Sequence, residues 1–219
     1  MLTLASIHDP TLQETLQTRV DDNLRKTLQA FIEDCDDSNE QFEHYSFVCN
    51  FLFSVSRPEA TTSLHCYHIT RLPDIFGHAC IRHVQSLCLL NACFVELPPS
   101  MLSMNLSFLD ISGNKYIRKL PEDLQKWHNM RHLDIDDCSR LQASNIVPLS
   151  RLPSLCILRF QNTCFWIALQ GANTDVRAPN RMVITHFLSD PTICAIREHY
   201  DSNHNEHLRQ LDDSKHSSE

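Results

Sequence analysis

The sequence predicts an α/β fold in which short strands recur at a regular interval and lie side by side in a parallel sheet. Three observations support this prediction. Four segments in the middle of the chain share one pattern of apolar residues, a Leu-Pro pair recurs between them in the same phase, and a stretch with helical periodicity precedes them.

The four segments that share the pattern begin at Val84, Leu106, Met130 and Leu155. Successive starts are therefore 22, 24 and 25 residues apart. Each segment is apolar at its first, fourth and sixth places. Because residues two apart on a strand point to the same face, the fourth and sixth places are expected inside and the places between them outside. The pattern predicts one short strand per segment.

The ninth place of each segment is expected to turn the chain sharply. Its side chain would lie inside and hydrogen-bond backbone groups that have no other partner, a role that Asn114, Cys138 and Thr163 can fill. The first segment has Ala92 there, beside Asn91, so its register is open to a slip of one residue. The Leu-Pro pairs at 72–73, 97–98 and 120–121 keep the same phase.

A fifth, degenerate segment is expected before the others, in TSLHCYHITRLPDIF. Here the polar Thr62 and His65 are interpreted as replacing leucines, and Tyr67 belongs to the segment. A parallel sheet with crossover helices would also alternate its elements, but its unit is normally about 30 residues or longer.

The stretch LSFLDISGNKYIRKLPEDLQKWHNMRHLDIDDC resembles the repeats of leucine-rich-repeat proteins, such as cytosolic scaffolds and plant-type immune receptors. The resemblance covers Val84 to about Phe165. It implies a short, curved solenoid of about four or five repeats with parallel strands on its concave face, closed by a cap at each end. It also implies a non-catalytic module that binds a protein.

The flanks are interpreted as these caps, with an independent effector domain as the alternative for the first sixty residues. Residues 1–60 are expected to form a helical cap, with one amphipathic helix over residues 10–34 begun by Asp9 and Pro10, and a second buried element from Phe47 that is either helix or strand. Residues 61–166 would hold the repeats. Residues 167–219 would form an irregular or helical cap, with a helix from Pro191, and a polar tail.

Composition excludes several classes of function. The net charge of −8 and the absence of a basic run argue against nucleic acid. No secretory signal and no membrane-spanning stretch are recognised, so a cytoplasmic protein without membrane contact is expected. Only three glycines occur, which leaves no material for a glycine-rich phosphate loop. No cofactor is expected.

The alternative to a binding module is a metal-binding protein or hydrolase that uses the histidines and cysteines between residues 65 and 83. His65, Cys66, His68, His78, Cys80 and His83 fall in this range. Their spacing lacks a C-x-x-C half, so surface histidines and buried thiols are favoured, with no metal site and no catalytic residue. A second group, His199, His204 and His207, is interpreted as solvated tail.

The predicted partner-binding surface consists of the outward places on the strands. Its residues are Leu90, Phe108, Asp110, His132, Asp134, Asp136, Asp137, Ile157 and Arg159. Aspartates that converge on neighbouring strands would need a cationic counterpart, which a basic surface on a protein partner would supply. Alternatively, Arg131, His132 and Arg159 neutralise them within the chain. The sequence thus predicts an adaptor, a regulator or the recognition part of a signalling or immune receptor, of unknown oligomeric state.

Overall fold

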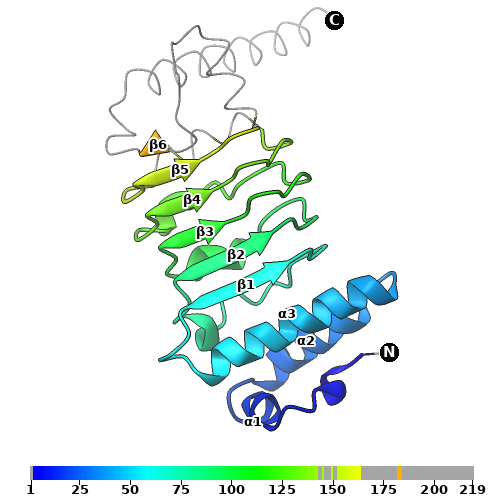
Figure 1. Cartoon of the computed structure of the whole chain (residues 1–219). Helices are drawn as coiled ribbons and strands as arrows, with labels where there is room; N and C mark the ends of the chain where they lie inside the picture. Colours follow the sequence, from blue (N-terminus) through cyan, green and yellow to red (C-terminus); the bar gives the residue numbers. More distant parts are fainter. Residues whose placement is uncertain (1, 143–144, 146–148, 150–151, 164–181, 184–219) are drawn as a thin grey trace, which may run out of the picture.

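The computed structural model describes residues 2–142, 145, 149, 152–163 and 182–183. It is an α/β structure, in which three helices come first and a sheet with five parallel strands follows (Figure 1). The helices lie together beyond the first strand, at one end of the sheet (Figure 1). Within the described residues, no helix has both the length and the apolar character needed to cross a bilayer.

Three helices make up the amino-terminal part: α1 (Pro10–Thr18), α2 (Asp22–Glu33) and α3 (Ser38–Ser56). Each is preceded by an aspartate whose carboxylate accepts backbone N–H groups of the first turn, as the Asp9 carboxylate does for α1. The expectation that Asp9 and Pro10 begin a helix is confirmed.

The expectation of one continuous helix over residues 10–34 is wrong. The helix is interrupted between α1 and α2, because Asp21 accepts the Leu24 N–H (2.8 Å) and so begins a second helix. The apolar residues keep their spacing of four across this interruption, and for that reason their pattern in the sequence predicts one continuous helix.

The buried element from Phe47, left open between helix and strand, is the second half of α3. Asp37 caps α3, whose buried face includes Phe47, Phe51 and Leu52. This helix packs against α1, α2 and the first strand, so it covers the apolar edge that β1 would otherwise expose.

The sheet has the strand order β1-β2-β3-β4-β5-β6. The parallel strands are β1 (Ser63–Tyr67), β2 (Ser86–Leu90), β3 (Phe108–Asp110), β4 (His132–Asp134) and β5 (Ile157–Arg159). A short β6 (Met182–Val183) pairs antiparallel with β5. Otherwise, the carboxyl-terminal region of residues 164–219, with the expected cap, the helix from Pro191 and the grouped histidines, lies outside the described residues.

One buried leucine from each parallel strand lies in a single row across the sheet. The row consists of Leu64, Leu87, Leu109, Leu133 and Leu158. The prediction that the segments form neighbouring strands of one parallel sheet is confirmed, since Leu109 pairs with Leu133 and Leu133 with Leu158. The first segment keeps this register, since Leu87 pairs with Leu109 and Ala92 is buried, so the slip considered for it does not occur.

The interpretation of the degenerate first segment is corrected. Thr62 and His65 do not replace leucines, because Leu64 pairs with Leu87 and Cys66 with Leu89. Both Leu64 and Cys66 are buried, whereas His65 stands at an exposed place between them. The segment therefore follows the shared pattern more closely than its sequence suggests.

The turn after each strand has one residue with positive φ at the eighth place. These residues are His68, Asn91, Gly113, Asp137 and Asn162. At Gly113 (φ 75°) a Cβ would lie 2.2 Å from the Asn91 Oδ1, so a side chain there would have to displace the Asn91 amide as well as adopt the left-handed conformation.

Side chains at the ninth place hydrogen-bond buried carbonyls, as expected. The Asn114 Nδ2 donates to the Leu89 carbonyl (2.7 Å) and to the Ile111 carbonyl (2.6 Å). The Cys138 thiol donates to the Ile111 carbonyl (3.2 Å) and so links neighbouring segments. The Thr163 hydroxyl donates to the Phe160 carbonyl (2.6 Å), a hydrogen bond within its own turn.

Candidate functional site

The outward places of the parallel strands form rows on the face opposite the leucine row. We call this surface the strand face and define it by its third, fifth and seventh places. The fifth-place row runs His65, Cys88, Asp110, Asp134 and Arg159. The third-place row runs Ser86, Phe108, His132 and Ile157.

The structure brings all nine predicted residues to the strand face or its edge. Leu90 continues from Tyr67 in the seventh-place row. Asp136 occupies the same place after β4, since its carbonyl accepts the Gly113 N–H and its neighbour Asp137 donates to the Gln161 carbonyl. Asp137 lies at the turn itself, with φ 59°. The register of the predicted surface is therefore as expected.

The acidic part of the strand face is neutralised from within. The Arg159 Nη1 lies 2.9 Å from the Asp134 Oδ2, and its Nη2 lies 2.7 Å from the Asp136 Oδ2. Both aspartates are buried, and only 4% of the Asp134 side chain is exposed. The alternative in which Arg159 neutralises these carboxylates is the one that the contacts favour, and Asp134 and Asp136 are not an open acidic patch.

Burial raises the pKa of the Asp134 carboxyl to about 6. The carboxylates of Asp110 and Asp136 also contribute to this raised pKa, whereas the Asp136 backbone N–H, donated to the Asp134 Oδ1 (3.0 Å), and the Arg159 guanidinium lower it. Loss of hydration thus outweighs the ion pair. The carboxyl of Asp134 is half protonated only slightly below neutral pH.

Two aspartates remain at the surface, each as a hydrogen-bond acceptor. The Asp110 Oδ1 accepts the Ser112 N–H (2.9 Å), and the Asp137 Oδ1 accepts from the Asn162 side-chain amide (2.8 Å). Asp110 is half-buried and Asp137 is exposed. Each keeps a second carboxylate oxygen, so a cationic group of a partner would meet these two and not the buried pair.

Large side chains with open surface lie at two places of the strand face, the seventh place of β1 and β2 and the third place of β3 and β4. Tyr67 on β1 is 51% exposed, and Leu90 beside it is half-buried. The Phe108 ring lies against the His132 ring, with centroids 4.6 Å apart and planes inclined by 58°. Three successive strands therefore present large side chains with open surface.

Sequence reasoning missed Tyr67 as a surface residue. The signal was present, because aligning Leu64 and Cys66 with Leu87 and Leu89 places Tyr67 beside Leu90. The cysteine had to be counted as a small apolar residue for this alignment to emerge.

The histidines and cysteines of residues 65–83 do not converge. Cys66 points into the core, and burial raises the pKa of its thiol to about 12. His65 stands on the strand face, and the His83 Nε2 lies 3.1 Å from the Ser54 hydroxyl. Among the described residues, no three His, Cys, Asp or Glu side chains are placed to hold a metal ion.

One contact within this range has the connectivity of a thiol, an imidazole and a carboxylate. The His78 Nδ1 lies 3.0 Å from the Cys80 Sγ, and its Nε2 lies 2.8 Å from the Asp21 Oδ2. The same Nδ1 accepts the Cys80 backbone N–H (3.3 Å), so His78 caps the short helix at Ala79–Ile81. Burial raises the pKa of the Cys80 thiol to about 11, which favours the neutral thiol. These contacts give the group a structural role.

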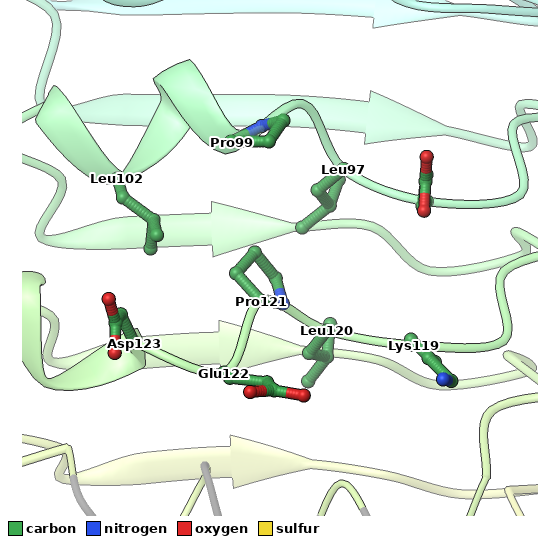
Figure 2. A pocket seen from close by; sticks show the side chains of 9 residues that line it. Leu97, Pro99, Leu102, Lys119, Leu120, Pro121, Glu122 and Asp123 are labelled. Atoms are coloured by element: carbon green, nitrogen blue, oxygen red, sulfur yellow. The ribbon is translucent and has the colours of Figure 1, made fainter.

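A shallow hollow of about 320 Å³ lies between two successive segments that follow the strands, residues 96–102 and 119–123 (Figure 2). Leu97 and Leu120, from two of the Leu-Pro pairs, are buried beneath it. Glu122 and Asp123 stand on its rim, and Lys119 lies at the end toward which the strands run (Figure 2). Its rim is charged and its floor apolar.

No protein-family model matches the chain, and the search of the curated proteins finds no significant match. Function therefore rests on the geometry of the strand face.

Proposed function

We propose that this chain is a leucine-rich-repeat protein, a short solenoid that binds another protein through its strand face and catalyses no reaction. The single observation that carries the binding proposal is that three successive strands present partly exposed large side chains, with Tyr67 beside Leu90 at the seventh place and Phe108 at the third place. Aromatic and aliphatic side chains ringed by polar groups are typical of the centre of a protein interface.

The repeat assignment is supported by features that recur once per segment. Each has a leucine in the buried row and a left-handed residue at the eighth place. At the ninth place, Asn114 and Cys138 both hydrogen-bond a carbonyl of the preceding segment. A unit that cannot bury its apolar face alone gains stability from this stacking.

The partner is expected to contact the large side chains of β1 to β3 and to reach the remaining carboxylates, Asp110 and Asp137. A cationic side chain on the partner would serve the latter, but the two buried aspartates are already paired with Arg159. An interface on so few strands would be of modest size, near about 800 Å² per partner. Such an area suits a transient adaptor or regulatory contact.

We further propose that the protein is cytoplasmic. Eight cysteines of the described residues are free thiols, two of them, Cys93 and Cys156, exposed. Exposed thiols persist in a reducing compartment and are readily oxidised elsewhere.

The experiment is quantitative affinity capture with the full chain, the double variant Tyr67→Ser/Leu90→Ser, and the matched control Phe42→Ser. Phe42 is an aromatic residue of α3 that is 60% exposed, so the control removes a similar apolar surface. The double variant should lose at least one partner that the control retains, while both unfold in urea at nearly the wild-type midpoint. Partner lists that are the same for all three proteins would contradict the proposal.

A further inference from the structure

A second ladder of backbone hydrogen bonds runs beyond the turns that end the strands. The Arg118 N–H donates to the Val95 carbonyl (3.0 Å), and the Gln142 N–H donates to the Arg118 carbonyl (3.0 Å). Glu96 and Lys119 form a parallel bridge in the same ladder. Residues from three successive segments are thereby fixed side by side, away from the strand face.

Four exposed cations lie on this ladder or within three residues of it in the sequence. We call them the basic ledge: Lys115, Arg118, Lys119 and Arg140. Within the part of the chain that the structure describes, none of them forms an ion pair, although Arg25, Arg71, Lys126 and Arg159 all do. Clustered cations without partners are unexpected on a chain whose net charge is −8, because acidic side chains are plentiful.

The ledge also has an ordered aromatic component. The Arg140 guanidinium lies 5.1 Å from the centroid of the Tyr116 ring, which is 45% exposed. Stacking on a ring restricts a guanidinium to fewer orientations, so less entropy is lost when it binds a carboxylate. The exposed Val95, bonded to Arg118 through the backbone, adds an aliphatic side chain to the same surface.

We propose that the basic ledge binds an acidic polypeptide segment of a partner, with carboxylates on Arg118, Lys119 and Arg140 and an apolar side chain beside Val95 and Tyr116. Charge complementarity is the basis for this choice of occupant. This surface is separate from the strand face, so the proposal goes beyond the proposed function.

A polypeptide fits the surroundings of the ledge better than a nucleic acid does. Glu96 is next to Lys119 in the ladder, and Glu122 and Asp123 stand on the rim of the adjoining hollow (Figure 2). The carboxylates of Glu122 and Asp123 would repel a continuous phosphate backbone, whereas a short acidic segment can end before it reaches them. Exposed aliphatic surface favours the same choice.

The test is fluorescence anisotropy with a labelled peptide in which glutamates flank one leucine, measured with the full chain. The triple variant Arg118→Gln/Lys119→Gln/Arg140→Gln should weaken binding by roughly tenfold or more, since three exposed ionic contacts are lost. A matched control, Lys26→Gln/Arg82→Gln/Arg131→Gln, removes three exposed cations elsewhere that have no ion pair among the described residues, and should change the Kd by less than about twofold.

Three results would overturn the proposal: no binding by the wild type, equal weakening by the control, or tighter binding of a labelled oligothymidine that the triple variant also loses. The last would identify a surface for polyanions in general. The Tyr67→Ser/Leu90→Ser variant should bind the peptide as the wild type does, so failure of the ledge and failure of the strand face are distinguished.

Discussion

Arg159 on β5 holds the buried carboxylate of Asp134 on β4, with the Nη1 2.9 Å from the Oδ2. The Arg159 side chain is 41% exposed, so the ion pair joins a buried carboxylate to a partly hydrated guanidinium. The second nitrogen of the same guanidinium binds Asp136. One cation thus satisfies two acids that would otherwise repel each other on the strand face.

Replacement of Arg159 by glutamine should destabilise the fold by roughly 1–3 kcal/mol at pH 8, because two buried carboxylates lose their cation. At pH 5 the loss should be smaller, since protonation of Asp134 relieves part of the repulsion. Urea unfolding at both pH values measures the difference. The control Arg131→Gln alters an exposed arginine with no ion pair among the described residues and should change the free energy of unfolding by less than about 0.5 kcal/mol. Equal values for the two variants would contradict the role given to Arg159.

The raised pKa of Asp134, about 6, predicts a specific dependence of stability on pH. Between the ordinary value of 3.8 and this one, folded Asp134 keeps a proton that the unfolded chain has lost. The free energy of unfolding therefore falls as the pH rises through this window, which is the sign for an acid that burial destabilises in its charged form.

The measurement compares the wild type with Asp134→Asn, which keeps an oxygen to accept the Asp136 N–H but cannot ionise. From pH 4 to pH 7 the stability of the wild type relative to this variant should fall by about 2–3 kcal/mol. The comparison cancels the opposite contributions of Asp21 and Glu40, whose pKa values are lowered by hydrogen bonds from a backbone N–H and from the Thr70 hydroxyl respectively. A difference that stays constant with pH would show that the ion pair with Arg159 fully offsets the effect of burial.

The register of the strands was predictable from the sequence because a period of two fixes it. A slip of one residue would turn Leu109 and Ile111 outward, so only one alignment buries both. The same rule, applied with Cys66 counted as apolar, would also have aligned β1 correctly and identified Tyr67.

The state of the aspartates was not predictable in this way. An outward place on a strand does not determine whether its side chain is exposed. Asp134 is covered by Arg159, 25 residues later in the sequence, whose side chain extends from β5 to β4. The basic ledge was not predictable from the sequence either, because Arg140 and Tyr116 come into contact only when successive segments stack. The interruption between α1 and α2 could have been predicted from the sequence, because aspartate, here Asp21, is favoured at a helix N-cap.

The Asn114 side chain donates two hydrogen bonds, whereas Cys138 and Thr163, at the same place of their segments, donate one each. It reaches the Leu89 carbonyl of the preceding segment, as Cys138 does for Ile111, and the Ile111 carbonyl of its own, as Thr163 does for Phe160. Asn114→Ala should cost roughly 2–3 kcal/mol, because the buried Leu89 carbonyl loses its side-chain donor and the Ile111 carbonyl loses one of two.

Asn114→Cys and Asn114→Thr should each retain one donation and lose only about half as much stability as the alanine variant. The cysteine would keep the link between segments and the threonine the link within its turn, so urea unfolding of the three variants separates the two contributions. If cysteine and threonine were no better than alanine, the ninth place would act through shape alone, and the hydrogen bonds of Asn114 would add nothing to the stacking of its segment on the one before.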